Sequence, residues 1–240
     1  MSEYDDIDYK EKWEFDESVA NVFENMLERS VPDYHNMRDL TVKLCDSLIL
    51  RDKRTFTMLD LGCSDGLNIR EFVKKYGSHG KYTLVDCSEA MLNKCRNIYA
   101  NWVDIGAIQI KNMDLRNEFP RGYYDVITSI LTVLFTPIQY RQTIIQNVYD
   151  NLNNGGVFVF VEKVLGNTAK IDSALVDMYY QMKHDNGYSY EQIERKRLSL
   201  EGVQVPVTSA WNIDLLKQAG FRQIDTYWRC MNFEGYVAVK

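Results

Sequence analysis

Two glycines and a downstream carboxylate are the residues whose types and spacing most directly suggest chemistry. Gly62 and Gly66 enclose Cys-Ser-Asp, directly after the apolar run 56–61 and before the helix-like run 67–76. A strand, a tight turn and a helix in this order place the turn where open α/β sheets bind nucleotide-like ligands. Glycine also permits sharp backbone angles and a close approach of a ligand to the main chain. The turn is therefore a candidate cradle for an adenosine group, although such a turn can serve backbone geometry alone.

Asp86 follows the next predicted strand, about 20 residues after the glycine turn. A carboxylate at this position accepts hydrogen bonds from both ribose hydroxyls of a nucleotide-like ligand. A nicotinamide-dependent enzyme would carry the same acid, so Asp86 alone leaves the cofactor open. It could also cap the helix that begins near Ser88.

Three further features argue against a nicotinamide cofactor. The turn lacks the third glycine of the G-x-G-x-x-G pattern. Asp114 follows the third predicted strand and offers a carboxylate for an adenine amino group, although it could be a solvated loop acid. The chain also closes with a predicted hairpin, introduced by residues 219–221, which is not the usual end of a nicotinamide-binding sheet.

The elements that must position these residues are those of a doubly wound α/β sheet, because strand-like and helix-like runs alternate. We expect strands at residues 56–61, 82–85, 107–110, 124–130, 157–161, 223–228 and 236–239. Helices are expected at residues 67–75, 89–101, 138–152 and 209–219, and a turn at residues 153–156. The connection between the last two strands is too short for a parallel crossover, so these strands should pair antiparallel.

Two helical segments are added to this alternation within a single domain, residues 1–240. Residues 1–50 form a helical arm, with a loose polar start and helices at 15–29 and 35–50. Residues 165–205 form a helical insertion, or cap, with helices at 171–183 and 190–200. Ser189 and Gln192 have the spacing of a capping box at the start of the second of these helices.

The composition excludes several classes of function. Hydrophobic residues make up 45% and charged residues 26% of the 240 residues, as in soluble globular enzymes. The net charge of −6 argues against direct nucleic-acid binding, and no apolar run suits a membrane span. The five cysteines lack disulfide or metal-ligand spacing, the three histidines are scattered, and the start of the chain is acidic, unlike a signal peptide. We therefore expect a cytoplasmic enzyme without a metal.

Residues 60–66, Asp86, Asp114-Leu115, 153–156 and the final hairpin resemble the class I S-adenosylmethionine (SAM) methyltransferases over most of residues 56–240. The resemblance implies a Rossmann-like, seven-stranded sheet with one antiparallel strand. It places SAM over the glycine turn, with its ribose on Asp86 and its adenine beside Asp114 and Leu115. The cofactor-binding residues that it implies are Asp60, Gly62, Cys63, Ser64, Gly66, Asp86, Cys87, Met91, Asp114, Leu115 and Ser129.

A closer resemblance extends over nearly the whole chain, to the carboxy-SAM synthase branch, whose chemistry uses prephenate and serves tRNA wobble-uridine modification. The segments that carry it are residues 15–17, 29–34, 162–163, 186–189, 196–197 and 228–233. Arg197 matches the arginine that those enzymes direct at the extra carboxylate, and Tyr34 matches a ligand-facing tyrosine. Ser129 and Val133 differ, because the synthases carry a ligand-binding asparagine after the fourth strand and a glutamine four residues later.

The sequence therefore predicts a SAM-dependent methyltransferase that acts on a small, anionic acceptor held by Arg197 beneath the helical insertion. Tyr34 and Tyr180 are further catalytic candidates, because aromatic faces favour a sulfonium charge. Arg197 could instead lie on a solvated helix face, and the two tyrosines could belong to the core. A homodimer is another expectation, since the insertion is rich in aromatic residues.

Three alternative functions are carboxy-SAM synthesis, a reaction of SAM itself such as cyclisation, and non-catalytic SAM binding. Polar substitutions in the cradle would favour the last of these. Asp65 is the one such substitution, and we expect it to point to solvent.

Overall fold

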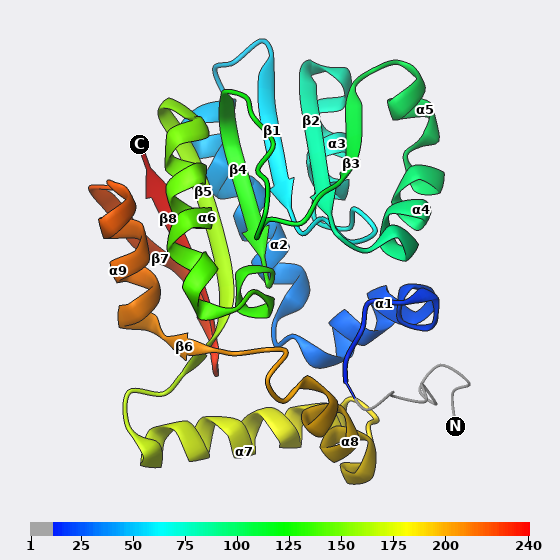
Figure 1. Cartoon of the computed structure of the whole chain (residues 1–240), viewed down its shortest axis with the longest axis vertical. Helices are drawn as coiled ribbons and strands as arrows, with labels where there is room; N and C mark the ends of the chain where they lie inside the picture. Colours follow the sequence, from blue (N-terminus) through cyan, green and yellow to red (C-terminus); the bar gives the residue numbers. More distant parts are fainter. Residues whose placement is uncertain (1–11) are drawn as a thin grey trace.

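The computed structural model describes residues 12–240 and shows a central sheet with helices on both faces (Figure 1). The strands are ordered β3-β2-β1-β4-β5-β8-β7, and an additional short strand, β6, pairs with β5 outside this row. Strand β8 runs antiparallel to its neighbours β5 and β7, whereas the other neighbouring pairs in the row are parallel. This arrangement confirms the predicted α/β class with one antiparallel strand.

The strands agree closely with the predicted ranges. They are β1 (Phe56–Leu61), β2 (Gly80–Asp86), β3 (Ile108–Asn112), β4 (Tyr124–Ile130), β5 (Leu152–Leu165), β6 (Val207–Thr208), β7 (Gln223–Cys230) and β8 (Phe233–Val239). The prediction missed β6, because two residues are too few to show an alternating pattern. The turn predicted at residues 153–156 is wrong, because this segment lies within β5. The amide of Gly155 donates to the carbonyl of Lys240 at 2.8 Å, so the end of the chain supplies the backbone partners that turn-forming residues would otherwise lack.

The helices of the described residues follow the predicted order. They are α1 (Glu17–Ser30), α2 (Tyr34–Cys45), α3 (Arg70–Tyr76), α4 (Glu89–Ile98), α5 (Ala100–Asp104), α6 (Ile138–Asn151), α7 (Ala169–Asp185), α8 (Tyr190–Leu200) and α9 (Ser209–Ala219). One π-helical turn (Asp46–Leu50) and two short 3₁₀ turns, η2 (Gly77–His79) and η3 (Val133–Phe135), accompany them. The helix predicted at 89–101 is divided into α4 and α5 at Tyr99, whose backbone leaves the helical conformation (φ −107°, ψ 19°) and whose hydroxyl donates to the carbonyl of Gly66.

Alternate residues of the central strands enter two separate cores, since successive strand side chains point to opposite faces. Met58 and Val126 pack with side chains of α2, α3 and α4. Leu59 and Ile127 pack with side chains of α6 and α9 on the other face. The apolar run 157–161 is completely buried, as expected for a strand covered on both faces.

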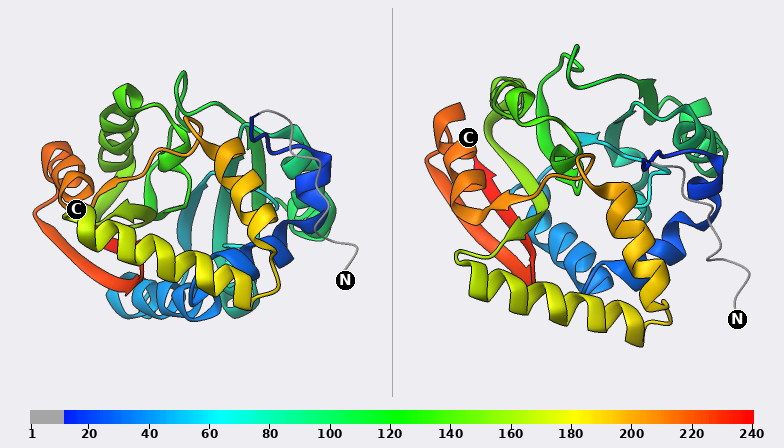
Figure 2. Two further views of the ribbon diagram at one scale, coloured as in Figure 1. Left: turned by 90° about the horizontal axis from the view of Figure 1, so that it is seen from below. Right: turned by 60° about the horizontal axis from the view of Figure 1, so that its bottom comes forward.

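The predicted insertion and α1 of the predicted arm lie at the carboxyl ends of the parallel strands (Figure 1), whereas α2 of the arm packs on one face of the sheet. Viewed from that end, α7 and α8 meet at an angle and lie across the end of the sheet (Figure 2). Helix α1 packs beside α4. The capping box at the start of α8 is confirmed, with the amide of Gln192 donating to Ser189 Oγ at 3.1 Å and the amide of Ser189 donating to Gln192 Oε1 at 2.8 Å. Across residues 12–240, none of the helices has the length and apolar character needed to cross a membrane.

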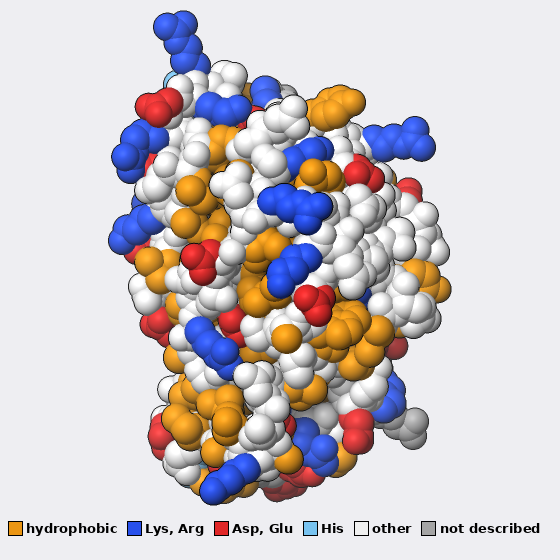
Figure 3. Space-filling model, turned by 90° about the vertical axis from the view of Figure 1, so that its left-hand side faces the viewer, with side chains coloured by type: hydrophobic (Ala, Val, Ile, Leu, Met, Phe, Trp, Pro, Cys, Tyr) orange, Lys and Arg blue, Asp and Glu red, His pale blue; other side chains and the backbone are white. Residues whose placement is uncertain are grey.

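One hollow lies far from the glycine turn, on the flank formed by α9 and the edge strand β7. Basic and hydrophobic side chains are mixed on this face of the molecule (Figure 3). The hollow has a volume of about 440 Å³ and is lined by Ile213, Lys217, Phe221, Arg222, Ile224, Asp225 and Thr226. Three strands separate β7 from β1 in the sheet, so this hollow is not part of the predicted site.

Candidate functional site

The glycine turn joins β1 to α3 in left-handed backbone conformations, with φ of 66° at Gly62, 49° at Ser64 and 82° at Gly66. A Cβ atom on Gly62 would lie 2.3 Å from side-chain atoms of Thr132, and one on Gly66 would lie 2.5 Å from the Tyr99 ring. Both glycines are therefore required by the protein's own packing and backbone angles. These contacts account for the glycines without any ligand, so the ligand must be argued from other groups.

Asp86 fastens the turn to the end of β2. Its Oδ2 accepts the amide of Ser64 at 2.9 Å, and its Oδ1 accepts the amide of Ser88 at 2.8 Å. Burial raises the pKa of Asp86, and these amides oppose that effect. Ser88 itself caps α4 by accepting the amide of Met91, so Asp86 is not the cap. Each oxygen of an ionised carboxylate has two lone pairs, so Asp86 can still accept ribose hydroxyls.

Asp60 at the end of β1 is completely buried. Its Oδ1 accepts Asn68 Nδ2 at 2.8 Å and Thr128 Oγ1 at 2.7 Å. Its Oδ2 has no hydrogen-bond partner among residues 12–240. Burial raises the pKa of Asp60 to about 6, and the two hydrogen bonds offset part of this increase. The carboxylate thus presents one unsatisfied oxygen beside the glycine turn.

Asp65 is buried, so the expectation that it points to solvent is wrong. Its Oδ2 lies 3.0 Å from Lys94 Nζ of α4, and the same amine donates to the carbonyl of Ala20 in α1 at 2.7 Å. This ion pair holds the turn and the arm together, which is why the acid can be enclosed. Asp65 Oδ1 is left without a partner in the described part of the chain.

Three unsatisfied buried atoms lie around the turn on different elements. They are Asp60 Oδ2 on β1, Asp65 Oδ1 in the turn and Arg38 Nε on α2, each unpartnered within residues 12–240. Ser129 Oγ on β4 is also unpartnered there, but it pairs in register with Leu61 and so points to the opposite face of the sheet from Asp60. Arg38 belongs to this group because it donates to the carbonyl of Leu67, just beyond the turn. Buried polar atoms normally have partners. Their concentration here fits a bound molecule that both donates and accepts hydrogen bonds.

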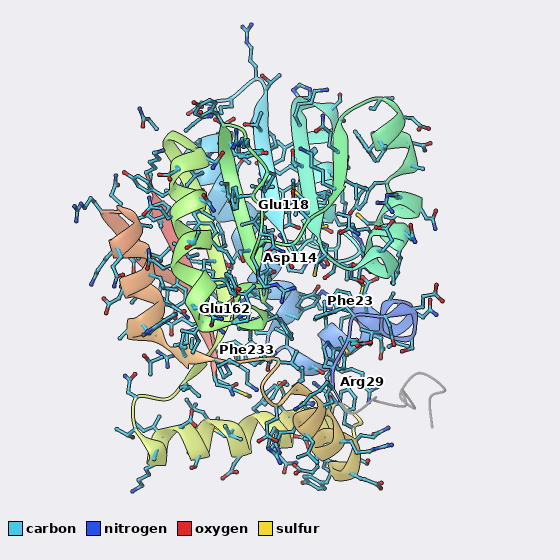
Figure 4. The ribbon with its side chains drawn as sticks, in the orientation of Figure 1. Phe23, Arg29, Asp114, Glu118, Glu162 and Phe233 are labelled. Carbon is cyan, nitrogen blue, oxygen red and sulfur yellow. The ribbon has the colours of Figure 1, made fainter. Side chains whose placement is uncertain are left out.

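Asp114 lies beside the carboxyl ends of the central strands (Figure 4). Its carboxylate accepts Arg116 Nε at 2.9 Å and Arg116 Nη2 at 2.5 Å, and the guanidinium lowers the pKa of Asp114. The carboxyl is therefore held ionised. The Arg116 amide at 2.9 Å and Asn117 Nδ2 at 3.3 Å also donate to it, so an adenine amino group would have to replace one of these donors. Leu115 is partly buried against the core on the α6 face.

The remaining predicted cofactor residues differ in exposure. Cys63 is buried, and burial raises the pKa of its thiol, as expected for a packing residue. Cys87 is exposed directly after Asp86. Met91 is fully buried and belongs to a cluster with Phe23 of α1, so it connects the cradle to the arm.

The residues just before α1 form a strap across the site, which the prediction of a loose start for residues 1–14 missed. Lys12 Nζ donates to the carbonyl of Glu201 at 2.8 Å, and the Trp13 amide donates to the carbonyl of Ser199 at 2.9 Å. The ring of Phe15 packs edge-on to Phe135 in η3, with centroids 5.2 Å apart. The carbonyl of Phe15 accepts Ser88 Oγ at 2.5 Å. Lys12–Phe15 therefore link α8, η3 and α4; residues 1–11 lie outside the described part.

Glu162 on β5 holds the segment that follows β4 (Figure 4). Its Oε1 accepts the amide of Val133 at 3.1 Å, and burial raises the pKa of Glu162 to about 8 despite the nearby charge of Arg141. Val133 in η3 is buried. Ser129 is fully buried within β4, inside the strand predicted at 124–130.

Of the three predicted catalytic residues, Tyr180 and Arg197 interact electrostatically, whereas Tyr34 interacts with a different set of charges. Tyr34 is buried at the start of α2 with the Arg38 guanidinium 5.3 Å from its ring centre, and burial raises the pKa of Tyr34 to about 12. Tyr180 of α7 packs against Tyr179, and the charge of Arg197 acts on it. The Arg197 side chain is 41% exposed and forms two 2.8 Å hydrogen bonds with Glu194. Its guanidinium is thus engaged on the surface of α8.

Comparison with known proteins gives one consistent result. A family model described as a methyltransferase domain matches residues 58–156. The chain is 35% identical to the carboxy-S-adenosyl-L-methionine synthase of Methylococcus capsulatus, over 94% of this chain and 93% of that protein. It is 34% identical to the synthase of that name from Campylobacter lari, over 96% of both chains. The chain belongs to the carboxy-SAM synthase family. It is a SAM-dependent transferase of the class I methyltransferase fold, and its cofactor is SAM.

Solved structures agree on the fold of this carboxy-SAM synthase family member. An O-methyltransferase family protein from Burkholderia thailandensis matches with a TM-score of 0.63 at 11% identity, over 93% of this chain and 60% of that chain. PigF, solved with SAH, matches with a TM-score of 0.61 at 14% identity, over 94% of this chain and 60% of that chain.

The groups around the turn match the chemistry of SAM. The cofactor carries an ammonium and two ribose hydroxyls that donate hydrogen bonds, and a carboxylate that accepts them. The unsatisfied carboxylate oxygens of Asp60 and Asp65 are acceptors, and Arg38 Nε is a donor. The set therefore offers acceptors for the ammonium of SAM and a donor for its carboxylate.

Proposed function

We propose that this enzyme transfers the methyl group of SAM to a small, anionic acceptor. The observation that carries the proposal is the chemistry of Ser129 and Val133. The resemblance to carboxy-SAM synthases implies an asparagine and a glutamine at these positions, whereas here both side chains are buried and neither carries an amide. The donors that would help to hold a carboxylated cofactor are thus absent from both positions.

The placement of SAM that we propose uses the groups around the turn. The ribose hydroxyls donate to Asp86, and the adenine lies beside Asp114 and Leu115. The ammonium lies at Asp60 Oδ2, where an opposite charge would lower the pKa of that carboxyl. The carboxylate lies toward Arg38, which already contacts the turn through Leu67.

The residues of the chain need to align and enclose the reactants rather than supply strong acid chemistry. When bound, SAM supplies a methyl group on a sulfonium, and the leaving group is a neutral thioether. Alignment of an acceptor with that methyl group supplies much of the acceleration in such a reaction. The ring of Tyr34 favours a cationic centre, and the strap at Lys12–Phe15 excludes water. A general base is needed only for an acceptor that must lose a proton.

Carboxy-SAM synthesis is the second candidate, and the names of the relatives favour it. Arg197 and Tyr34 are also present at the matching positions. For this reaction, Arg197 would have to leave Glu194 and hold the transferred carboxylate through two parallel hydrogen bonds.

A mass-spectrometric assay separates the two candidates. Purified enzyme is incubated with SAM and prephenate, and the carboxylated sulfonium is sought. We expect SAM to bind and no carboxylated product to form. Accumulation of that product at catalytic turnover would overturn the methyltransferase proposal, and failure to bind SAM would overturn both.

A further inference from the structure

Two lysines at the acceptor side of the site have no acidic partner. Lys163 lies at the end of β5 and Lys183 lies on α7. Within residues 12–240, neither amine donates a hydrogen bond or forms an ion pair. Their contacts are with aromatic rings: Lys163 Nζ lies 4.6 Å from the centre of the Tyr179 ring, and Lys183 Nζ lies 5.7 Å from the same centre. Two cations thus converge on one tyrosine.

The rings of Tyr188 and Phe233 complete the surroundings of these amines. Lys183 Nζ lies 5.1 Å from the Tyr188 ring centre, and Lys163 Nζ lies 6.0 Å from the Phe233 ring centre. Figure 4 shows Phe233 and Arg29 between the carboxyl ends of the strands and helices α7 and α8. Neither amine is among the fully enclosed unpartnered atoms of the described residues, so each keeps some contact with solvent.

Positive charge predominates around Lys163 and Lys183. Burial lowers the pKa of Lys163 to about 8, and Asp172 on α7 offsets this only in part. The Oδ1 atom of Asp172 already accepts the amide of Gly166 at 2.7 Å. Burial, together with the charges of Lys163 and Arg29, lowers the pKa of Lys183 to about 8. In a chain of net charge −6, this is a local excess of positive charge.

Buried amines without acceptors destabilise a folded protein unless something else compensates them. An anion bound between them would supply both the hydrogen bonds and the opposite charge. The aromatic rings would meanwhile contact an apolar part of the same molecule. A carboxylate on a small organic compound combines these two requirements.

The position of the cluster connects it to the cofactor cradle. Tyr179 and Phe233 belong to the same apolar cluster as Tyr34 and Cys63 of the cradle. Lys163 also lies two residues beyond Val161, whose carbonyl accepts the amide of Leu131 directly after β4. A molecule bound at the lysines would therefore lie at the sheet edge that carries the glycine turn.

We propose that Lys163 and Lys183 bind the carboxylate of the second substrate, with Tyr179, Tyr188 and Phe233 contacting its apolar part. This inference rests on the proposed function, since it names the anionic group of the acceptor and the residues that hold it. It assigns to this lysine pair the role that the sequence alone assigned to Arg197.

Binding of 3-phenylpropanoate by the full-length enzyme, with 3-phenylpropanamide and inorganic phosphate as comparison probes, tests the proposal by calorimetry. We expect the carboxylate to bind more tightly than either comparison probe. Lys183→Gln and Lys163→Gln should each weaken its binding at least tenfold, while Lys163→Arg should retain most of it. Lys170→Gln, an exposed substitution on α7, is the matched control. Unchanged carboxylate binding in both glutamine variants, or equal binding of the amide, would overturn the proposal.

Two further measurements distinguish anion binding by the lysines from a purely structural role of these residues, and distinguish a failure of this proposal from a failure of the proposed function. At pH 8.5 a bound carboxylate should draw protons onto the amines, so the binding heat should depend on the ionisation enthalpy of the buffer. The double glutamine variant should lose that dependence. SAM affinity should stay within twofold of wild type in every variant. If a variant loses carboxylate binding but still binds SAM, the lost interaction is the one at the lysines and not the one at the cofactor cradle.

Discussion

The cradle at the ends of β1 and β2 and the lysine cluster at the end of β5 hold their charges in opposite ways. In the cradle, acids are fixed by hydrogen bonds from several elements, as when Asp86 accepts the amides of Ser64 and Ser88. In the lysine cluster, amines from β5 and α7 lie over aromatic rings without acceptors. The first region is preorganised for a ligand with donors, and the second requires an anion. Under the two proposals, the two substrates are recognised by charges of opposite sign at one edge of the sheet.

The largest expected effect concerns the cradle. Asp86→Ala should reduce SAM affinity about 100-fold, because it removes the acceptor of the ribose hydroxyls and both amide contacts that align the turn. Calorimetric titration with SAM measures the change. Asp177→Ala, which removes an exposed acid on α7, is the control and should leave the affinity unchanged. If 3-phenylpropanoate binding fell equally in Asp86→Ala, the two regions would not be separate.

Gly62→Ala should destabilise the fold by about 2 kcal/mol, because the new Cβ meets Thr132 and the residue keeps a left-handed φ. Urea unfolding of the ligand-free enzyme measures it. In a Thr132→Ala background the same change should cost less, since the collision is relieved and the backbone strain remains. Equal costs in both backgrounds would show that Thr132 is not the reason for the glycine.

Asp60→Asn should change folding stability and SAM affinity in opposite directions. At pH 7.5 the variant should be more stable than wild type by about 1–2 kcal/mol, because the native fold no longer contains a buried carboxylate with a raised pKa. Its SAM affinity should fall about tenfold, since a charge-assisted hydrogen bond is lost.

The pH dependence of the wild-type enzyme checks the same group. With a folded pKa of about 6, above the unfolded value of 3.8, Asp60 contributes stability that is present below 3.8 and lost as the pH rises through 6. SAM affinity should run the other way and weaken as the pH falls through 6. A SAM affinity that is flat between pH 5 and 7.5 would contradict this assignment.

The smallest expected effect is at Arg197. Because its guanidinium is paired with Glu194 on the surface, Arg197→Gln should change 3-phenylpropanoate affinity less than twofold, in contrast to Lys183→Gln. Calorimetry on the two variants side by side makes the comparison. A larger effect at Arg197 would indicate that the anion binds to Arg197 on α8, and it would favour carboxy-SAM synthesis.

The fold was accessible to sequence analysis where short-range patterns decide structure. The predicted range of β4 is identical to the observed one, and the continuous apolar run of β5 correctly indicated a strand buried on both faces. The errors arose where residues distant in the sequence determine the local structure. The turn-like residues 153–156 pair with residues near position 240, and Tyr99, at which a predicted helix is divided, contacts Gly66.

Sequence analysis predicted less of the candidate site than of the fold. Strand order and a run of motifs placed Asp86 and the glycine turn at one edge of the sheet, and the structure has them in contact through Ser64. The burial of Asp65 could not be predicted, because its partner Lys94 lies on another helix. Nor could the strap, since Trp13 and Phe15 show no pattern that identifies their partners on α8 and η3.

The sequence by itself determined the α/β class, because this depends on periodicity and on turns between adjacent elements, and it predicted a cofactor cradle with Asp60 and Asp86. Only the tertiary structure decided which charges meet. Lys163 and Lys183 are 20 positions apart, and they converge on Tyr179 because α7 packs back over the end of β5. Arg197, the more conspicuous residue in the sequence, is engaged by an acid on its own helix. Long-range packing therefore leaves Lys163 and Lys183 without an acidic partner among residues 12–240, whereas Arg197 is paired with an acid from its own helix.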